Sequence, residues 1–523
     1  MISMTPQHLP IPGREDMVQN DAGGYTFAVN DWQRLRRFLI LGSSGTYYAT
    51  ARTLTLENAA AVRRCLERDG SRVVQEIVEV STQGLAPRND PALFALAMAL
   101  QFGDLETRRA AARALLPVAR TGTHVLHLAG FVDGLGGWGR LTRAALAGWY
   151  NGKSAEDLAY QVVKYQQRDG WSHRDVLRLA HPRPPSDEHN AIYRWITHGW
   201  NDLPADGGPR LIWAFEQAKH ARMSEAVRLI NDYGLTREMI PTHLLRHPQV
   251  WEALLHRMPL WATVRNLGKM SQVGLLKPMS DAAALVCKRL RDAEYIRKSR
   301  LHPLAVLTAL AVYEYGHAVR GGLSWSPVGS IVDALDDAFY LAFNNVEPTG
   351  KRILLAIDAS ASMTARLADS IFSCRQAALA MALITARVEP SYLVIGFTHG
   401  RHVVELPISP RQRVDDAMRA LERHIHATST DCTLPMKFAL DNGIAVDAFV
   451  IYTDSETWVG GAHPCEMLTR YREQSGIPAK LVVVAMVANR FTIGDPADPG
   501  TLNVVGFDAS APRTIAGFIA GQF

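Results

Sequence analysis

The chain has 523 residues, of which 47% are hydrophobic and 20% are charged, and its formal net charge is +5. This length and hydrophobic content predict two or more domains with sizeable cores. No apolar run approaches the roughly 18 to 20 residues that span a bilayer, and residues 1–21 are polar and carry acids, so we expect neither a membrane helix nor a secretory leader. Five scattered cysteines without a close pair predict free thiols in a reducing cytoplasm.

Residues 31–343 have a helical pattern. Segments 57–67, 91–101, 108–118 and 140–150 place apolar residues at three- and four-residue intervals, with short Gly, Pro, Asn and Asp breaks between them. So long a helical region favours a bundle or a stack of helix pairs, that is, an α-solenoid, whose repeats are degenerate because no clean period is visible. The excess of positive charge lies here: the first 345 residues hold 40 basic and 33 acidic residues, and the remainder holds 16 and 18.

Within this region, residues 140–183 hold eight basic residues against four acids. Lys164 and Arg168 are four residues apart, which predicts that both lie on one face of a helix that ends at Asp169-Gly170. A second helix follows, capped by Ser172. Cations and helix N-terminal amides that converge in this way form a phosphate-binding surface, although a solvated turn between two surface helices is the alternative. The candidate contacts are Arg140, Lys164, Arg168, His173, Arg174, Arg178 and His181.

A domain boundary is expected at residues 346–350, which divides the chain into a helical part, 1–345, and a second part, 346–523. In the second part we expect strands at 352–358, 392–397, 447–453 and 479–486, with helices between them, the first at 364–388. Alternating strands and helices predict right-handed crossovers and a mainly parallel, doubly wound sheet of the Rossmann-like α/β class.

Oxygen-bearing side chains stand at the ends of these strands. The first strand ends in Asp358-Ala359-Ser360-Ala361-Ser362, Thr430 lies in a polar loop, and Asp454 closes another apolar run. In doubly wound sheets ligands bind outside the carboxyl ends of the strands. Hard oxygen donors suit Mg²⁺, with Mn²⁺ or Ca²⁺ as alternatives. The order resembles the metal-ion-dependent adhesion site of von Willebrand factor A domains, with Asp358, Ser360, Ser362, Thr430 and Asp454 as ligands.

A simpler interpretation of the first motif is a helix cap. Ser362 would then cap the helix that follows the strand, and Asp358 would merely end the strand. We favour the metal site because three separate elements occur in the expected order at strand ends. The three hydroxyls are expected to bind the ion directly and the two aspartates mainly through water.

The segment 163–181 resembles the signature of the Ro autoantigen family, whose RNA-binding part is called the TROVE module. Further stretches that resemble this family are 34–39, 45–48, 251–254, 258–260, 265–270, 347–352, 430–432 and 477–481. Together they extend over nearly the whole chain, which looks like a bacterial member. One departure is Ala427-Thr428-Ser429 before the loop threonine, where the family commonly has Gly-Gly.

The resemblance implies a multidomain protein in which a HEAT-like solenoid closes into a ring beside a von Willebrand factor A domain. It implies small noncoding Y RNAs on the outer surface, contacted by Lys164, Arg168 and His181, and single-stranded 3′ ends of misfolded RNAs in the central hole. It also implies a non-catalytic cytoplasmic role in RNA quality control, maturation or decay and in stress survival. The expected partners are 3′-to-5′ exoribonucleases such as polynucleotide phosphorylase, with the protein as a monomer in a ribonucleoprotein.

Two other functions stay open on the sequence. One is a metal-dependent protein-adhesion scaffold without specific RNA binding, in which the helical region only supports the metal domain. The other is a metal-dependent hydrolase that uses Asp358, although no close-set carboxylate cluster that could hold two metals is visible. His424 and His426 are interpreted as surface or packing residues.

Overall fold

The computed structural model describes residues 4–42, 50–200, 209–319, 321–343, 347–367, 370–400, 403–409, 412, 416–417, 419, 429–508 and 510–522. Several sequence features lie outside the described residues: the stretch 45–48, the expected boundary between residues 345 and 346, His424, His426 and loop residues 427–428. The boundary therefore stays a prediction. No helix within the described part of the chain is long and apolar enough to cross a membrane.

The helical part begins and ends close to the predicted limits. Side-chain caps such as Asp104, Ser154 and Ser280 accept hydrogen bonds from the third residue of the helix they precede, which satisfies amides that have no partner within the helix. The helices are α1 (Asp31–Leu41), α2 (Ala51–Gln83), α3 (Asp90–Phe102), α4 (Leu105–Val118), α5 (Gly122–Gly134), α6 (Arg140–Asn151), α7 (Ala155–Lys164), α8 (His173–Ala180), α9 (Asp187–His198), α10 (Arg210–Ala218), α11 (Met223–Tyr233), α12 (Pro248–Arg257), α13 (Leu260–Gln272), α14 (Asp281–Leu290), α15 (Ala293–Ser299), α16 (Pro303–Tyr315) and α17 (Gly329–Leu341), with short 3₁₀ turns η2 (Arg237–Met239) and η3 (Leu244–Arg246).

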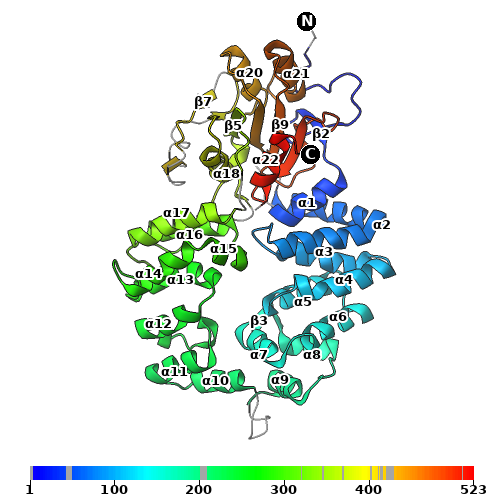
Figure 1. Ribbon diagram of the computed structural model, residues 1–523. Coiled ribbons are helices and arrows are strands. Elements are labelled where there is room, and N and C mark those ends of the chain that lie inside the picture. The colour runs from blue at the N-terminus through cyan, green and yellow to red at the C-terminus, as the bar shows by residue number, and fades with distance from the viewer. Residues whose placement is uncertain are drawn as a thin grey trace.

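These helices close into a ring. Helices α1 to α9 descend along one side and α10 to α17 return along the other, so that both ends of the solenoid lie beneath the sheet domain (Figure 1). The two arms meet at His302, which is 3% exposed. Its Nε2 lies 3.3 Å from the carbonyl oxygen of Leu85 in the first arm and 3.0 Å from that of Phe507 in the sheet domain. The expected closed solenoid is confirmed, and one buried imidazole contacts all three parts.

The second part is a six-stranded sheet with the order β11-β9-β8-β5-β6-β7, in which only the edge strand β7 is antiparallel to its neighbour. Alternate residues of the central strand face opposite cores: Leu355 and Ile357 pack with α18 and α22, and Leu354 and Ala356 pack with α20 and α21. The bounds are β5 (Ile353–Asp358), β6 (Tyr392–Phe397), β7 (Val403–Glu405), β8 (Ala448–Thr453), β9 (Lys480–Ala485), β11 (Thr501–Val505), α18 (Cys374–Val388), α20 (Leu434–Asp441), α21 (Pro464–Ser475) and α22 (Ala511–Ala520). The predicted α/β class is confirmed.

One predicted helix boundary is wrong, and one hairpin was not predicted. The helix expected at 364–388 begins only at Cys374, because Ser373 and Gln376 form the capping box that starts it. Ser362 instead opens a short 3₁₀ turn, η4 (Ser362–Thr364), so it does not cap the long helix. Strands also occur in the helical region, where β3 (Gln167–Arg168) pairs with β4 (Trp171–Ser172).

The N-terminal segment before α1 belongs spatially to the sheet domain, which we did not predict. Strands β1 (Met17–Gln19) and β2 (Tyr25–Ala28) form a small antiparallel sheet with β10 (Phe491–Thr492). The chain therefore crosses from the sheet domain into the ring at α1.

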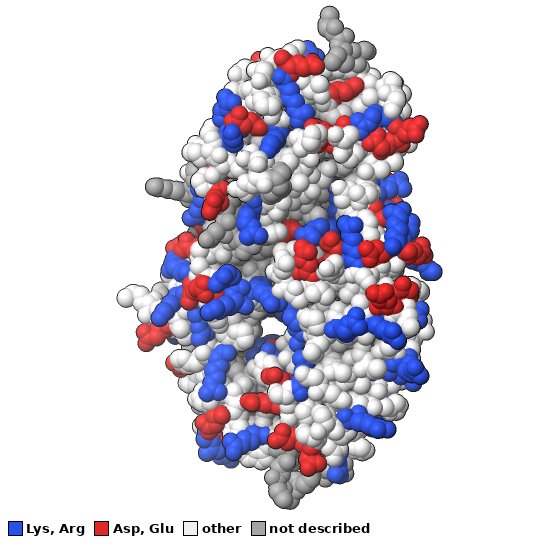
Figure 2. Space-filling view, turned by 45° about the vertical axis from the view of Figure 1, so that its right-hand side comes forward, with Lys and Arg blue, Asp and Glu red and all other residues white. Residues whose placement is uncertain are grey.

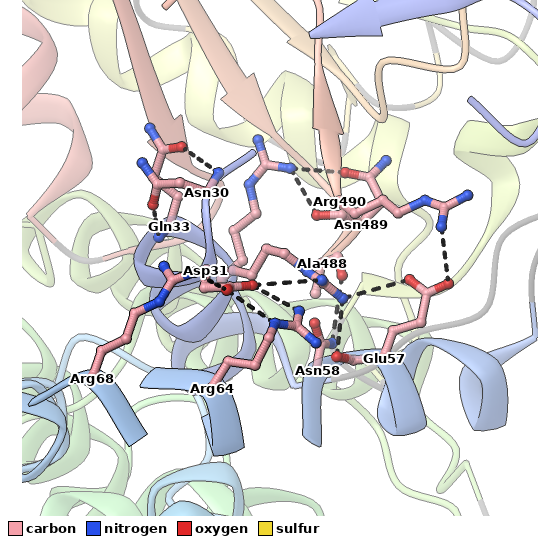
Figure 3. A network of polar contacts seen from close by, with 12 residues as sticks. Asn30, Asp31, Gln33, Glu57, Asn58, Arg64, Arg68, Ala488, Asn489 and Arg490 are labelled. Atoms are coloured by element: carbon pink, nitrogen blue, oxygen red, sulfur yellow. Dashed lines mark hydrogen bonds and ion pairs between the residues drawn. The ribbon is translucent and has the colours of Figure 1, made fainter. Parts of the chain in front are cut away.

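A polar network joins the first ring helices to the loop before β10 (Figure 3). Arg64 of α2 forms an ion pair with Asp31 at 2.7 Å, and Glu57 lies 4.0 Å from Arg490. Arg37 of α1 contacts the same loop, and its Nη1 donates to the backbone oxygen of Asn489 (3.0 Å), to Oδ1 of the same residue (2.8 Å) and to the oxygen of Phe491 (2.9 Å). Because a buried guanidinium is costly unless its donors are satisfied, this contact fixes how the two parts join.

Candidate RNA interface and metal site

A basic surface surrounds the β3–β4 hairpin. Asp169 and Gly170 have φ values of 49° and 81°, so both occupy the left-handed region that a two-residue hairpin turn requires. Arg168 is exposed on this hairpin, and Arg174 and Arg178 are exposed one turn apart on α8. These three arginines and the exposed Arg140, on the neighbouring α6, form no ion pair with another described residue. His181 is also exposed, as the left-handed residue that ends α8. The structure thus gathers five of the seven predicted cationic positions on exposed surface.

Lys164 lies elsewhere. Helix α7 ends at this residue and the chain turns into the hairpin, so the prediction that Lys164 and Arg168 share one helix face is wrong. The Lys164 ammonium donates to the hydroxyl of Tyr160 at 2.9 Å and lies 5.3 Å from the centre of the Tyr165 ring. Its side chain lines the inner cavity of the ring.

His173 is a packing residue, which corrects its prediction as a phosphate contact. It is 3% exposed, its Nδ1 lies 2.7 Å from the hydroxyl of Tyr150, and its ring stacks on that of Trp149. Burial lowers its pKa to about 4, so the ring is neutral at pH 7. A neutral, enclosed imidazole cannot contact an RNA backbone on the surface.

The inner wall of the ring carries a second set of cations that the sequence did not reveal. A cavity of about 880 Å³ lies between the two arms, and Figure 2 shows the hollow with Lys and Arg side chains along its rim. Glu238 is the only acid among its described lining residues. The lining cations are Arg88, Arg120, Lys164, Arg237, Arg265 and Arg300. Among the described residues, Arg88 forms an ion pair with Asp90, whereas Arg120, Lys164, Arg237, Arg265 and Arg300 form none.

The five predicted metal ligands converge. Asp358 ends β5, and its carboxylate accepts from the backbone amide of Ser360 at 3.0 Å and from the hydroxyl of Thr453 at 2.6 Å. The hydroxyl oxygens of Ser360 and Ser362 are 3.0 Å apart. The residues are buried, with exposed fractions of 0% for Asp358, 1% for Ser360, 2% for Ser362, 1% for Thr430 and 1% for Asp454. Strand β5 lies between β6 and β8, so the site is at the point where the strand order reverses.

The two carboxylates are held in an environment that favours their neutral form. Burial raises the pKa of Asp358, against hydrogen bonds from Thr453, Ser360 and Thr430. Burial and repulsion from Asp358 raise the pKa of Asp454 to about 7, while a hydrogen bond from Ser362 lowers it. One oxygen of Asp454, Oδ2, is buried without a hydrogen-bond partner in the described structure.

This donor set fits a divalent cation. A cation would offset the repulsion between the two aspartates and give the unpartnered carboxylate oxygen a ligand. The described residues contain no group of three or more His, Cys, Asp or Glu side chains with metal-site geometry, so the candidate site depends on hydroxyls together with two carboxylates. Metal binding itself stays a prediction.

The N-terminal segment supports two loops of this site. Gln7, which is fully buried, donates to Oδ1 of Asp431 at 2.9 Å and accepts from the hydroxyl of Thr457 at 2.5 Å. Asn489, the partner of Arg37, donates in turn to the backbone oxygen of Asp454. These supports could not be predicted from local sequence patterns, because each joins residues more than 30 positions apart.

Comparison with known proteins defines the class. A TROVE domain matches residues 18–205 and 227–315, and a Ro60 vWA domain matches residues 352–519. The chain belongs to the Ro60 family. It is 40% identical over 516 residues to the RNA-binding protein RO60 of Deinococcus radiodurans, covering 97% of this chain and 96% of the relative. It is 34% identical over 589 residues to the RNA-binding protein RO60 of Caenorhabditis elegans, covering 97% and 91%. The crystal structure of the Deinococcus radiodurans RO (RSR) protein matches 94% of this chain and 100% of that chain, with a TM-score of 0.70 and 39% identity.

Proposed function

We propose that this protein is a non-catalytic RNA-binding scaffold of noncoding RNA quality control. It binds Y RNA on its outer basic surface and takes single-stranded 3′ ends of misfolded or precursor RNAs into the ring. It acts as a monomer within a cytoplasmic ribonucleoprotein and presents RNA to a 3′-to-5′ exoribonuclease such as polynucleotide phosphorylase, including under stress. The names of its relatives as RNA-binding proteins support the general activity.

The inner cavity carries this proposal. Six cations and one acid line about 880 Å³, and four of the five arginines have no acidic partner among the described residues. Like charges held together in this way repel one another, and a polyanion that entered would neutralise them. A ring of backbone-binding cations accepts a single strand of any sequence.

The outer surface supports the Y RNA part of the proposal. Arg168, Arg174 and Arg178 are exposed, lie on or next to the β3–β4 hairpin and have no described acidic partner. Exposed guanidinium groups on a rigid element suit a folded RNA, which is recognised by shape and by its phosphates.

The test compares RNAs that differ only in their ends. A hairpin with a single-stranded 3′ tail should bind far more tightly than a blunt hairpin of equal length or a circularised form of the tailed RNA. Y RNA should compete with the tailed RNA even where their sequences are unrelated. Equal affinity of the circle would refute entry by a free end, and RNA turnover by the purified protein would refute the non-catalytic role.

A second proposal concerns the metal site, because its five buried oxygen-bearing residues converge and leave a carboxylate oxygen without a partner. Ser360, Ser362 and Thr430 would hold Mg²⁺ with Asp358 and Asp454, and the ion would supply a ligand position for an acidic group of a partner protein. Asp358→Ala should abolish divalent-ion binding and leave RNA affinity nearly unchanged. An equal loss of RNA affinity in a folded variant would contradict this separation. An adhesion scaffold without RNA binding would leave the basic inner wall unexplained.

A further inference from the structure

An aromatic pocket adjoins the inner cavity. It has a volume of about 660 Å³, within the range of roughly 300 to 1,000 Å³ typical of small-molecule sites. Its walls come from α12, α13, α16 and the turn that follows α16, together with η2, η3 and the connection before α3. Arg237, Trp261 and Arg265 line both this pocket and the inner cavity, so the two spaces lie side by side.

The aromatic wall is held in place by specific contacts. The indole nitrogen of Trp325 donates to the backbone oxygen of Tyr313 at 3.0 Å, and the two rings are stacked. Gly268 lets the indole lie against α13, since a Cβ there would come within 2.7 Å of the Trp325 ring. Gly316, at φ +75°, turns the chain so that its oxygen accepts from the Trp325 amide at 2.9 Å. The half-buried indole is therefore preorganised.

Trp261 adds a second half-buried indole on α13, one turn before Arg265. Because positions four apart lie on one helix face, the ring and the guanidinium point toward the same space. Arg265 itself is exposed and has no described acidic partner. Aromatic surface and a free cation thus lie together where the pocket meets the cavity.

The charge of the pocket indicates the kind of ligand. Its described lining residues include no Asp or Glu. The cations are Arg88, Arg237, Arg246, Arg265 and Lys269. A group that matches this wall has a flat apolar face and several negative charges close by. Nucleotides within a strand meet both conditions, whereas a fatty acid carries one charge and a flexible chain.

From this geometry we infer that the pocket receives a nucleobase of the single strand in the inner cavity. The base lies against the indoles of Trp261 and Trp325, and Arg237 and Arg265 bind the phosphates beside it. Since every base has a stacking face, such a pocket tolerates many sequences. The inference rests on the proposed RNA function and adds to it a fixed position for one base of the strand.

The experiment is an abasic scan of a tailed hairpin RNA. Each tail nucleotide is replaced in turn by an abasic one, and the affinity of the full-length protein is measured. The loss of one stacked base should weaken binding by about 5- to 150-fold at one position and much less elsewhere. Ala309→Trp, which fills the pocket without changing its charge, and Trp261→Leu should abolish this dependence on position. Trp213→Leu, an exposed tryptophan outside the pocket, is the matched control and should keep it.

The outcomes separate the inference from the function on which it rests. If the wild type binds the tailed RNA and the scan is flat, the base pocket is refuted and the RNA function stands. If the wild type does not bind the tailed RNA, both are refuted. A position-dependent loss that persists in a folded Trp261→Leu or Ala309→Trp variant also refutes the pocket. The base pocket is also refuted if oleate binds in it and the affinity for tailed RNA does not change.

Discussion

Replacing Arg237 and Arg265 together by Gln is the most direct test of the inner wall. Both side chains line the cavity and neither has an acidic partner among the described residues, so their removal leaves no carboxylate unpaired. Any loss of RNA binding would then come from the RNA contact and not from a broken ion pair.

The expected size follows from counterion release. For single strands the slope of log affinity against log salt is about −0.7 for each phosphate neutralised, so two lost contacts should make the slope shallower by about 1.4. Between 50 and 200 mM salt, a fourfold increase, the affinity of the wild type should therefore fall about 7-fold more than that of the double variant.

The assay is equilibrium binding of a labelled tailed hairpin across a salt series, with melting curves to establish folding. The matched control is Arg222→Gln, just before α11, with Arg228→Gln on α11, which removes the same charge from exposed positions that do not line the cavity. The control should keep a slope close to that of the wild type. If the double variant also keeps it, Arg237 and Arg265 do not neutralise RNA phosphates.

Two further changes test the supports of the candidate metal site, and a third tests the junction of the ring at His302. Gln7→Ala should weaken Mg²⁺ or Mn²⁺ binding by about 10- to 100-fold, because it frees the loops beside two ligands; calorimetry would show an unchanged affinity if the support were unimportant. Arg37→Met should lower the free energy of unfolding by about 2–5 kcal/mol in urea titrations, since it leaves three buried acceptors unpaired; a loss below 1 kcal/mol would contradict this. Burial lowers the pKa of His302 from 6.5 to about 4, so the unfolded state takes up a proton at a higher pH than the folded state. The free energy of unfolding should therefore decrease as the pH is lowered from 6.5 to 4, by at most about 1.4 kcal/mol per pH unit. His302→Asn should make this decrease in stability at acid pH smaller. An identical pH dependence in the variant would show that His302 does not cause it.

The predicted strands show how much a local pattern can determine. An apolar run that ends in a carboxylate placed β5 and Asp358 within one residue of their positions in the structure. The apolar run 392–397 likewise predicted the bounds of β6 (Tyr392–Phe397). All of β5 and the last four residues of β6 are buried, and a strand that is buried on both faces is a continuous apolar run in the sequence. Because the carboxyl ends of adjacent parallel strands share an edge, the convergence of Asp358 and Asp454 could also be expected from sequence.

Predictions failed where the spacing of polar residues did not show which way their side chains point. Lys164 and Arg168 have helical spacing, yet the helix ends at Lys164 because Asp169-Gly170 closes a hairpin. A polar residue such as His173 is expected on the surface, but its ring packs against Trp149 and Tyr150. A basic residue looks the same in sequence whether its side chain meets solvent, a cavity or a core.

The sequence by itself determined the extent of the helical region and the four central strands of the sheet, and it placed the oxygen donors of the candidate metal site at or near strand ends. Only the tertiary structure decided the inner wall, where Arg88, Arg237 and Arg300 come together from different connections of the ring. It alone also joined Gln7 to Asp431, 424 residues away. The physical reason is that helix and strand formation depend on neighbours within a few residues, whereas the meeting of distant loops depends on how the whole solenoid closes.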